Sequence, residues 1–167
     1  MLMFCCVSLV AAKCHWKFMS QISNARILIV DDNLPNTRLI ERILESGGLN
    51  NFRSLHNGRE ALATVKEFEP DLILLDLHMP DVDGFEVIRQ IRELSQKEPY
   101  LPVLVLTADV NPAVRNKALA MGAKDFLSKP LDAIEVLLRV RNLLETRFLY
   151  EKLNDDFADY RHKNEEA

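Results

Sequence analysis

Hydrophobic and polar positions alternate in blocks along the chain from about residue 26 onwards. Short apolar runs predict five strands, which span 27–30, 52–55, 71–76, 102–106 and 125–128. Apolar residues at helical spacing predict helices between them, at 34–46, 58–68, 85–94, between Asn111 and Gly122, and from about 130 onwards. Strands that alternate with helices in this way indicate βαβ units and a parallel sheet with right-handed crossovers.

The third expected strand indicates how this sheet is covered. Its residues from Leu72 to Leu75 are all apolar, which is typical of a parallel strand with helices on both of its faces. We therefore expect a doubly wound α/β fold, in which ligands bind at the carboxyl ends of the strands.

Polar side chains follow four of the expected strands. Asp31 and Asp32 come after the first strand, Asp76 after the third, Thr107 after the fourth and Lys129 after the fifth. Because the carboxyl ends of parallel strands lie at one edge of a sheet, we expect these five side chains to converge there. Taken singly, each has an ordinary explanation as a helix cap, a turn residue, a strand-end residue or a solvated lysine. Their joint order is what predicts a site.

The predicted cluster suits phosphoryl transfer. Three crowded carboxylates repel one another, and a hard divalent cation such as Mg²⁺ relieves that repulsion with oxygen ligands. A carboxylate beside such a cation can act as a nucleophile toward a phosphoryl group. Positive and hydrogen-bonding groups must then surround the phosphoryl oxygens, which Lys129 and Thr107 could provide. We therefore interpret Asp76 as a phosphoryl acceptor.

Four segments together resemble the response-regulator receiver family of two-component signalling. They are Ile27–Asn33, Leu74–Gly84, Leu106–Ala108 and Phe126–Pro130. The resemblance covers about residues 25–145, and it implies a five-stranded sheet in the order 2-1-3-4-5 with helices on both faces.

The resemblance also implies roles for the acidic residues. Asp76 would be phosphorylated by a histidine kinase or a phosphotransfer protein. Asp32 would bind Mg²⁺ directly, with Mn²⁺ as a substitute, and Asp31 would assist, often through water. The backbone carbonyl of His78 would be a further ligand, while its side chain has the simpler interpretation of an exposed loop histidine.

Further roles follow from the same resemblance. Thr107, followed by Ala108, would move to hydrogen-bond the phosphoryl group, Lys129 would pair with it, and Phe126 would move inward with Thr107. The Lys129–Pro130 peptide bond is expected to be cis. His78 and Asp109 occupy positions that tune the lifetime of the phosphoryl group.

A switch of this kind is not expected to be a turnover enzyme, and the sequence fits two classes of enzyme less well. A haloacid-dehalogenase phosphatase also uses an aspartate nucleophile with Mg²⁺, but it requires a second aspartate two residues later, where this chain has His78. No glycine-rich phosphate loop follows the first strand, which argues against a nucleotide-binding enzyme. An unphosphorylated pseudo-receiver scaffold remains an alternative, although the complete Asp, Thr and Lys set argues against it.

The last helix is expected to continue to about residue 160. Apolar residues recur every seven positions, with two more placed three residues later: Val136, Leu143, Tyr150 and Phe157, then Leu153 and Tyr160. This spacing predicts a coiled-coil seam and a homodimer, flawed by Arg139 and Thr146 at two seam positions. The alternative is an amphipathic helix that lies on its own domain. Residues 146–167 would be a linker to an output domain absent from this chain, and 141–150 resemble linkers in receiver proteins with HD-GYP phosphodiesterase domains.

The composition of the chain argues against some classes of binding partner. The net charge of −4 gives no basic surface for nucleic acid or for a lipid membrane. The cysteines all lie within the first fourteen residues, at Cys5, Cys6 and Cys14, and their position favours a reducing cytoplasm over a disulfide framework. About eleven apolar residues near the start are too few to span a bilayer. We expect residues 1–24 to lie outside the domain, with a translation start near Met19 and an interfacial anchor as the alternative.

Overall fold

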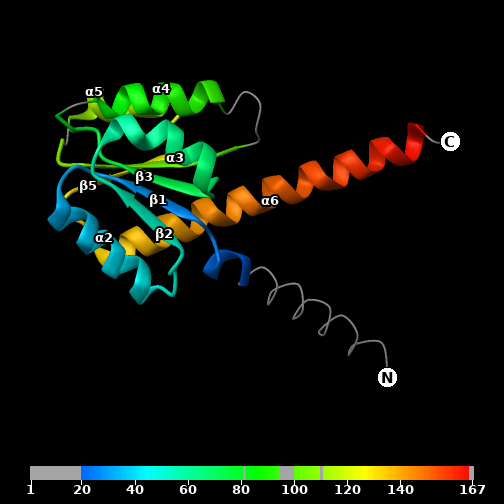
Figure 1. Ribbon diagram of the computed structural model, residues 1–167, viewed down its shortest axis with the longest axis horizontal. Coiled ribbons are helices and arrows are strands. Elements are labelled where there is room, and N and C mark those ends of the chain that lie inside the picture. Colours follow the sequence, from blue (N-terminus) through cyan, green and yellow to red (C-terminus); the bar gives the residue numbers. More distant parts are fainter. Residues whose placement is uncertain (1–19, 81, 95–99, 110, 166–167) are drawn as a thin grey trace.

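The sheet has the order expected from the sequence. The computed structural model describes residues 20–80, 82–94, 100–109 and 111–165 (Figure 1). Five parallel strands pair in the order β2-β1-β3-β4-β5. Their bounds are Ile27–Val30, Phe52–Leu55, Leu72–Leu75, Val103–Thr107 and Asp125–Ser128 for β1 to β5. The predicted strands therefore begin and end within one residue of those observed.

The helices follow the predicted alternation. They are α2 (Leu34–Ser46), α3 (Ala61–Phe68), α4 (Gly84–Leu94), α5 (Pro112–Met121) and α6 (Ala133–Glu165), with a 3-10 turn at Gly58–Glu60 before α3. The side chains of Asn33 and Asn111 accept hydrogen bonds from backbone N–H groups in the first turns of α2 and α5. A proline follows each of these caps near the start of the helix, where its missing N–H costs no hydrogen bond.

Alternate residues of the strands divide the core into two halves. Ile27 and Ile29 of β1 pack with α2 and α6, whereas Leu28 and Val30 pack with α3, α4 and α5. All four side chains are fully buried. Figure 1 shows the same two helical layers, one on each side of the sheet. Burial on both faces explains why the central strands are continuously apolar.

The core extends further toward the amino terminus than predicted. Ile22 and Ala25 are buried and belong to the half of the core that contains α2 and α6. A domain boundary at residue 24 is therefore wrong for Ile22, because packing of this side chain makes its segment part of the folded unit. The predicted start near Met19, the cysteines and the expected extension or anchor lie outside the described residues.

The last helix is continuous, and its two halves have different surroundings. Val136 and Leu143 are buried in the domain's own core, as are Val140, Leu144 and Phe148. The predicted dimer seam is therefore wrong at Val136 and Leu143, where the apolar face already packs against the sheet and α2. The C-terminal part of the helix extends away from the domain (Figure 1). No helix among the described segments is both long and apolar enough to cross a membrane.

Candidate functional site

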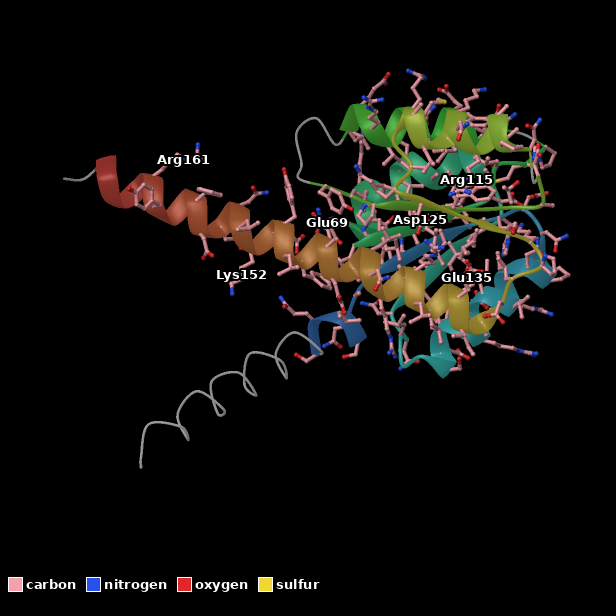
Figure 2. All side chains as sticks on the ribbon, turned by 180° about the vertical axis from the view of Figure 1, so that it is seen from behind. Glu69, Arg115, Asp125, Glu135, Lys152 and Arg161 are labelled. Carbon is pink, nitrogen blue, oxygen red and sulfur yellow. The ribbon has the colours of Figure 1, made fainter. Side chains whose placement is uncertain are left out.

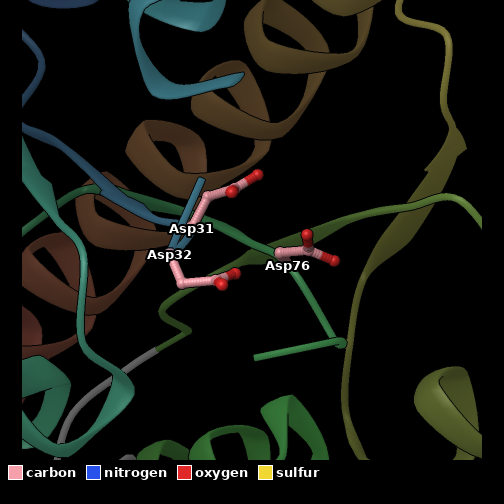
Figure 3. A group of neighbouring side chains, drawn as sticks. All are labelled: Asp31, Asp32 and Asp76. Atoms are coloured by element: carbon pink, nitrogen blue, oxygen red, sulfur yellow. The ribbon is translucent and has the colours of Figure 1, made fainter. Parts of the chain in front are cut away.

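Three carboxylates meet at the carboxyl edge of the sheet, as predicted. Asp31 and Asp32 follow β1, and Asp76 follows the neighbouring strand β3. Figure 3 shows their side chains grouped at this edge. Each carboxylate offers one oxygen atom, and these oxygens lie within 4.8 Å of one another. Asp31 and Asp76 are buried, whereas Asp32 is exposed to solvent.

Lys129 bridges the two buried carboxylates. Its Nζ donates to Oδ2 of Asp31 at 2.7 Å and to Oδ2 of Asp76 at 2.6 Å. Burial by itself disfavours the charged ammonium, but these hydrogen bonds and the charges of both aspartates outweigh it, so the pKa of Lys129 is raised above its ordinary 10.5. The site thus keeps a protonated lysine at neutral pH.

The donor set fits a hard divalent cation. Mg²⁺ prefers carboxylate oxygens and retains water ligands, which the exposure of Asp32 permits. One ammonium group offsets only part of the charge of three ionised carboxylates, so a further cation would reduce their repulsion. Asp31, Asp32 and Asp76 could therefore hold Mg²⁺. Ligation by the His78 carbonyl stays a prediction.

The loop after Asp76 returns tightly onto its own strand. The backbone N–H of His78 donates to Oδ1 of Asp76 at 3.2 Å, and the N–H of Gly84 donates to the Leu77 carbonyl at 3.0 Å. A Cβ atom at Gly84 would lie only 2.5 Å from the Asp76 carbonyl oxygen and 2.6 Å from Cα of Leu77. Because both atoms belong to the backbone, Gly84 is needed for this close approach.

The substitution Gly84→Ala is accordingly expected to destabilise the fold. Overpacking of this kind costs about 1–3 kcal/mol, and more where backbone has to move. Urea unfolding would measure the loss. Gly58→Ala is the matched control, because its added Cβ would first meet the flexible end of the Met79 side chain, at 2.9 Å. An equal loss of stability in both variants would contradict this account of Gly84.

Thr107 lies at the same edge of the sheet as His78 and Asp109, the two residues expected to tune the lifetime of the phosphoryl group. Thr107 is fully buried, and its Oγ1 accepts a hydrogen bond from the backbone N–H of Asp109 at 3.2 Å, while Ala108 between them is exposed. Nε2 of His78 lies 3.7 Å from Oδ2 of Asp109. The structure therefore brings together His78 and Asp109, which the sequence marked only separately. The Lys129–Pro130 bond is cis, as predicted.

Three contacts at the site were not predicted. Asn36 donates from Nδ2 to both oxygens of Asp31, at 3.3 and 3.2 Å. Nδ1 of His56 lies 3.3 Å from the Asp31 carbonyl oxygen. The guanidinium of Arg115 lies 5.7 Å from the ring centroid of Phe126, the partly buried residue expected to switch. Asn36 follows Asp31 by five residues, in the first turn of α2. This short separation is the sequence feature from which their contact could have been predicted.

Comparison with known proteins agrees with the fold and gives the family of the chain. The sequence profile of the response regulator receiver domain family matches residues 27–141. The chain is 36% identical over 134 residues to the transcriptional regulatory protein TrcR of Mycobacterium tuberculosis. The matched region covers 80% of this chain and 51% of TrcR. It is 41% identical over 126 residues to the transcriptional regulatory protein ResD of Bacillus subtilis. This match covers 75% of this chain and 50% of ResD. The chain thus spans about half the length of these two relatives.

A solved structure shows the same architecture. The chemotaxis protein CheY4 of Vibrio cholerae superposes with a TM-score of 0.66 and 30% sequence identity, over 72% of this chain and 98% of that protein. Its fold agrees with the strand order and helical layers described above. The family profile covers more than half of the chain, including all five strands and the residues of the aspartate cluster. The chain therefore belongs to the response regulator receiver domain family, whose members are signalling switches of two-component systems.

Proposed function

We propose that Asp76 accepts a phosphoryl group, with Mg²⁺ bound by the neighbouring aspartates. The observation that carries this proposal is the placement of Asp76 beside Asp31, Asp32 and Lys129 at one edge of the sheet. Receiver domains take their phosphoryl groups from histidine kinases or phosphotransfer proteins, so the donor here is a phosphohistidine of such a partner.

Asp76, Lys129 and Asp31 would each have a distinct part in the transfer. An oxygen of Asp76 attacks phosphorus, the bond between phosphorus and the donor imidazole breaks, and the imidazole leaves as the neutral ring after taking up a proton. Bound Mg²⁺ would supply positive charge at the phosphoryl oxygens. Lys129 provides a second cation, already 2.6 Å from Asp76, and Asp31 holds that ammonium in place. Such preorganised charge is the main requirement of phosphoryl transfer.

The readout of phosphorylation would begin at Thr107. Its hydroxyl turns from the Asp109 N–H toward the phosphoryl oxygens, and Phe126 moves into the space that Thr107 vacates. Phe126 lies beneath the guanidinium of Arg115 on α5, so its movement alters the surface formed by β5 and α5. The long helix α6, which follows β5 directly, then passes the change to an output partner.

Phosphorylation by a small donor tests the proposal. Acetyl phosphate with Mg²⁺ is expected to add the mass of one phosphoryl group to the intact chain, and hydroxylamine should remove it because it cleaves acyl phosphates. A chelator added before the donor should prevent the modification. No mass increase with Mg²⁺, or an equal increase in the presence of the chelator, would refute the proposed site.

The alternatives gain no support from the structure. A phosphatase of the haloacid-dehalogenase type would need an acidic residue at position 78, whose histidine lies beside Asp109. A pseudo-receiver scaffold would have no use for three carboxylates placed close together, because their mutual repulsion costs stability. The family match likewise favours a phosphorylated switch over either alternative.

A further inference from the structure

The part of α6 beyond the domain carries a stripe of exposed apolar side chains. The members of this stripe are Leu149, Tyr150, Leu153, Phe157 and Tyr160. At about 100° of rotation per residue, they fall within an arc of about 100° on one side of the helix. Figure 2 shows this part of α6, with Lys152 and Arg161 labelled, extending clear of the sheet and its covering helices. Leu149, Leu153, Phe157 and Tyr160 are each more than half exposed, whereas the Tyr150 ring keeps one face against Tyr100 of the chain's own domain.

The stripe begins where the helix leaves the core. Asn142, Glu145 and Thr146, in the preceding turns, are exposed and polar, so the stripe is separate from the exposed apolar residues near the start of α6. Arg147 donates from Nη1 to the Tyr100 carbonyl at 3.0 Å, and the rings of Tyr100 and Tyr150 stack with centroids 5.6 Å apart. These contacts fix the direction in which the stripe leaves the domain.

The spacing of the stripe matches a second helix of the same kind. Tyr150 and Phe157 are seven residues apart, and Leu153 and Tyr160 each follow three residues later. This is the a and d spacing of a two-stranded coiled coil. We propose that the stripe pairs with the stripe of a second copy of this chain, and that the two helices run parallel.

The charges beside the stripe favour the parallel arrangement. With Tyr150 and Phe157 at position a, Asp156 lies at position g and Arg161 at position e of the next heptad, and both side chains are exposed. In a parallel pair, position g faces position e of the next heptad on the other helix, so Asp156 faces Arg161 of the partner subunit. Because the pair has twofold symmetry, this opposite-charge contact forms two times in the dimer. An antiparallel pair would bring g to g and e to e, so Asp156 would not face Arg161 and this attraction would be lost.

The short length of the stripe does not prevent pairing. An isolated helix of this length would be marginal in water because its first turn is costly to form. Here Val140, Leu144 and Phe148 hold the preceding turns of the same helix in the core, so that cost is already met. Pairing then requires only that exposed apolar side chains leave water. This inference concerns assembly and does not depend on the phosphorylation of Asp76.

Mass measurement tests the pairing. Light scattering of the full chain is expected to give about twice the 19.2 kDa of one copy at high protein concentration, and Leu153→Glu should return the mass to that of a single copy. Leu138→Glu is the matched control, because both leucines are about equally exposed on α6, at 57% for Leu138 and 55% for Leu153, and only Leu153 belongs to the stripe. A single-copy mass for the wild type, or equal effects of the two changes, would overturn the proposal.

Charge exchange tests the orientation. Asp156→Arg or Arg161→Asp alone replaces two attractions by two repulsions and should raise the dimer dissociation constant by roughly fivefold or more. The double variant restores opposite charges in a parallel pair and should recover most of the wild-type affinity. A double variant as weak as the single ones, or single variants as tight as the wild type, would exclude the parallel pair.

Discussion

Asp76→Asn is expected to abolish phosphorylation of the chain by acetyl phosphate in the presence of Mg²⁺. The asparagine amide keeps the size and most hydrogen-bonding capacity of the aspartate, but it is neutral and lacks a nucleophilic carboxylate oxygen. Because Asp76 is buried and contacted by both Lys129 and the His78 N–H, no other carboxylate can take its place in the same surroundings. Intact-mass measurement should show the unmodified chain alone.

The matched control for this variant is Asp83→Asn. Asp83 lies in the same loop, and its Oδ1 accepts a hydrogen bond from the backbone N–H of Phe85 at 3.0 Å. An asparagine oxygen can accept the same bond, so the fold and the phosphorylation should both be retained. If Asp76→Asn and wild type gained equal mass, the assignment of Asp76 as phosphoryl acceptor would be wrong.

Lys129→Met is expected to lower the free energy of unfolding by about 3 kcal/mol in the absence of Mg²⁺. The change leaves the Asp31 and Asp76 carboxylates close together, with 2% and 9% of their side chains exposed, and without the ammonium that now contacts both. Removing one partner of a buried ion pair costs about 3–5 kcal/mol, and the 15% exposure of Lys129 favours the lower value. Urea unfolding in the presence of a chelator measures the difference.

The pH dependence gives this prediction a second readout. The pKa of Lys129 is raised in the folded chain, so its contribution is fully present below the ordinary value of 10.5 and is lost as the pH rises through the folded pKa. The difference between wild type and Lys129→Met should stay constant through neutral pH and shrink in strong alkali. Lys66→Met is the control, since Lys66 lies exposed on α3. Equal losses in the two methionine variants would contradict the role given to Lys129.

The strands and the cluster of aspartates could be predicted because each has a local signature. A buried parallel strand is apolar at every position, and its carboxyl end places the next polar residue at the sheet edge. The buried face of a helix follows polarity less closely: apolar Leu39 of α2 is 47% exposed, whereas polar Thr37 on the same helix is fully buried. Side-chain size and the shape of the neighbouring surface decide such cases, and neither is local.

The seam on α6 shows the same limit more clearly. A seven-residue repeat says that one side of a helix is apolar, but it does not say what that side packs against. At Val136 and Leu143 the partner is the sheet of the same domain, while Tyr150 and Phe157 carry the same repeat past the last core contacts. The contact of Arg115 with Phe126 likewise depends on the tertiary arrangement of the helices.

The continuity of α6 makes it a mechanical lever. Residues 133–148 are held against the sheet, and residues 149–165 form an arm of about 25 Å, at about 1.5 Å per residue. Tilting that arm by about 10° at its base would displace its tip by roughly 4 Å, comparable to the diameter of a methyl group and far more than any atom near the pivot would move. Small repacking at the Tyr100 and Arg147 contacts, which form this pivot, would therefore be amplified at the distal end.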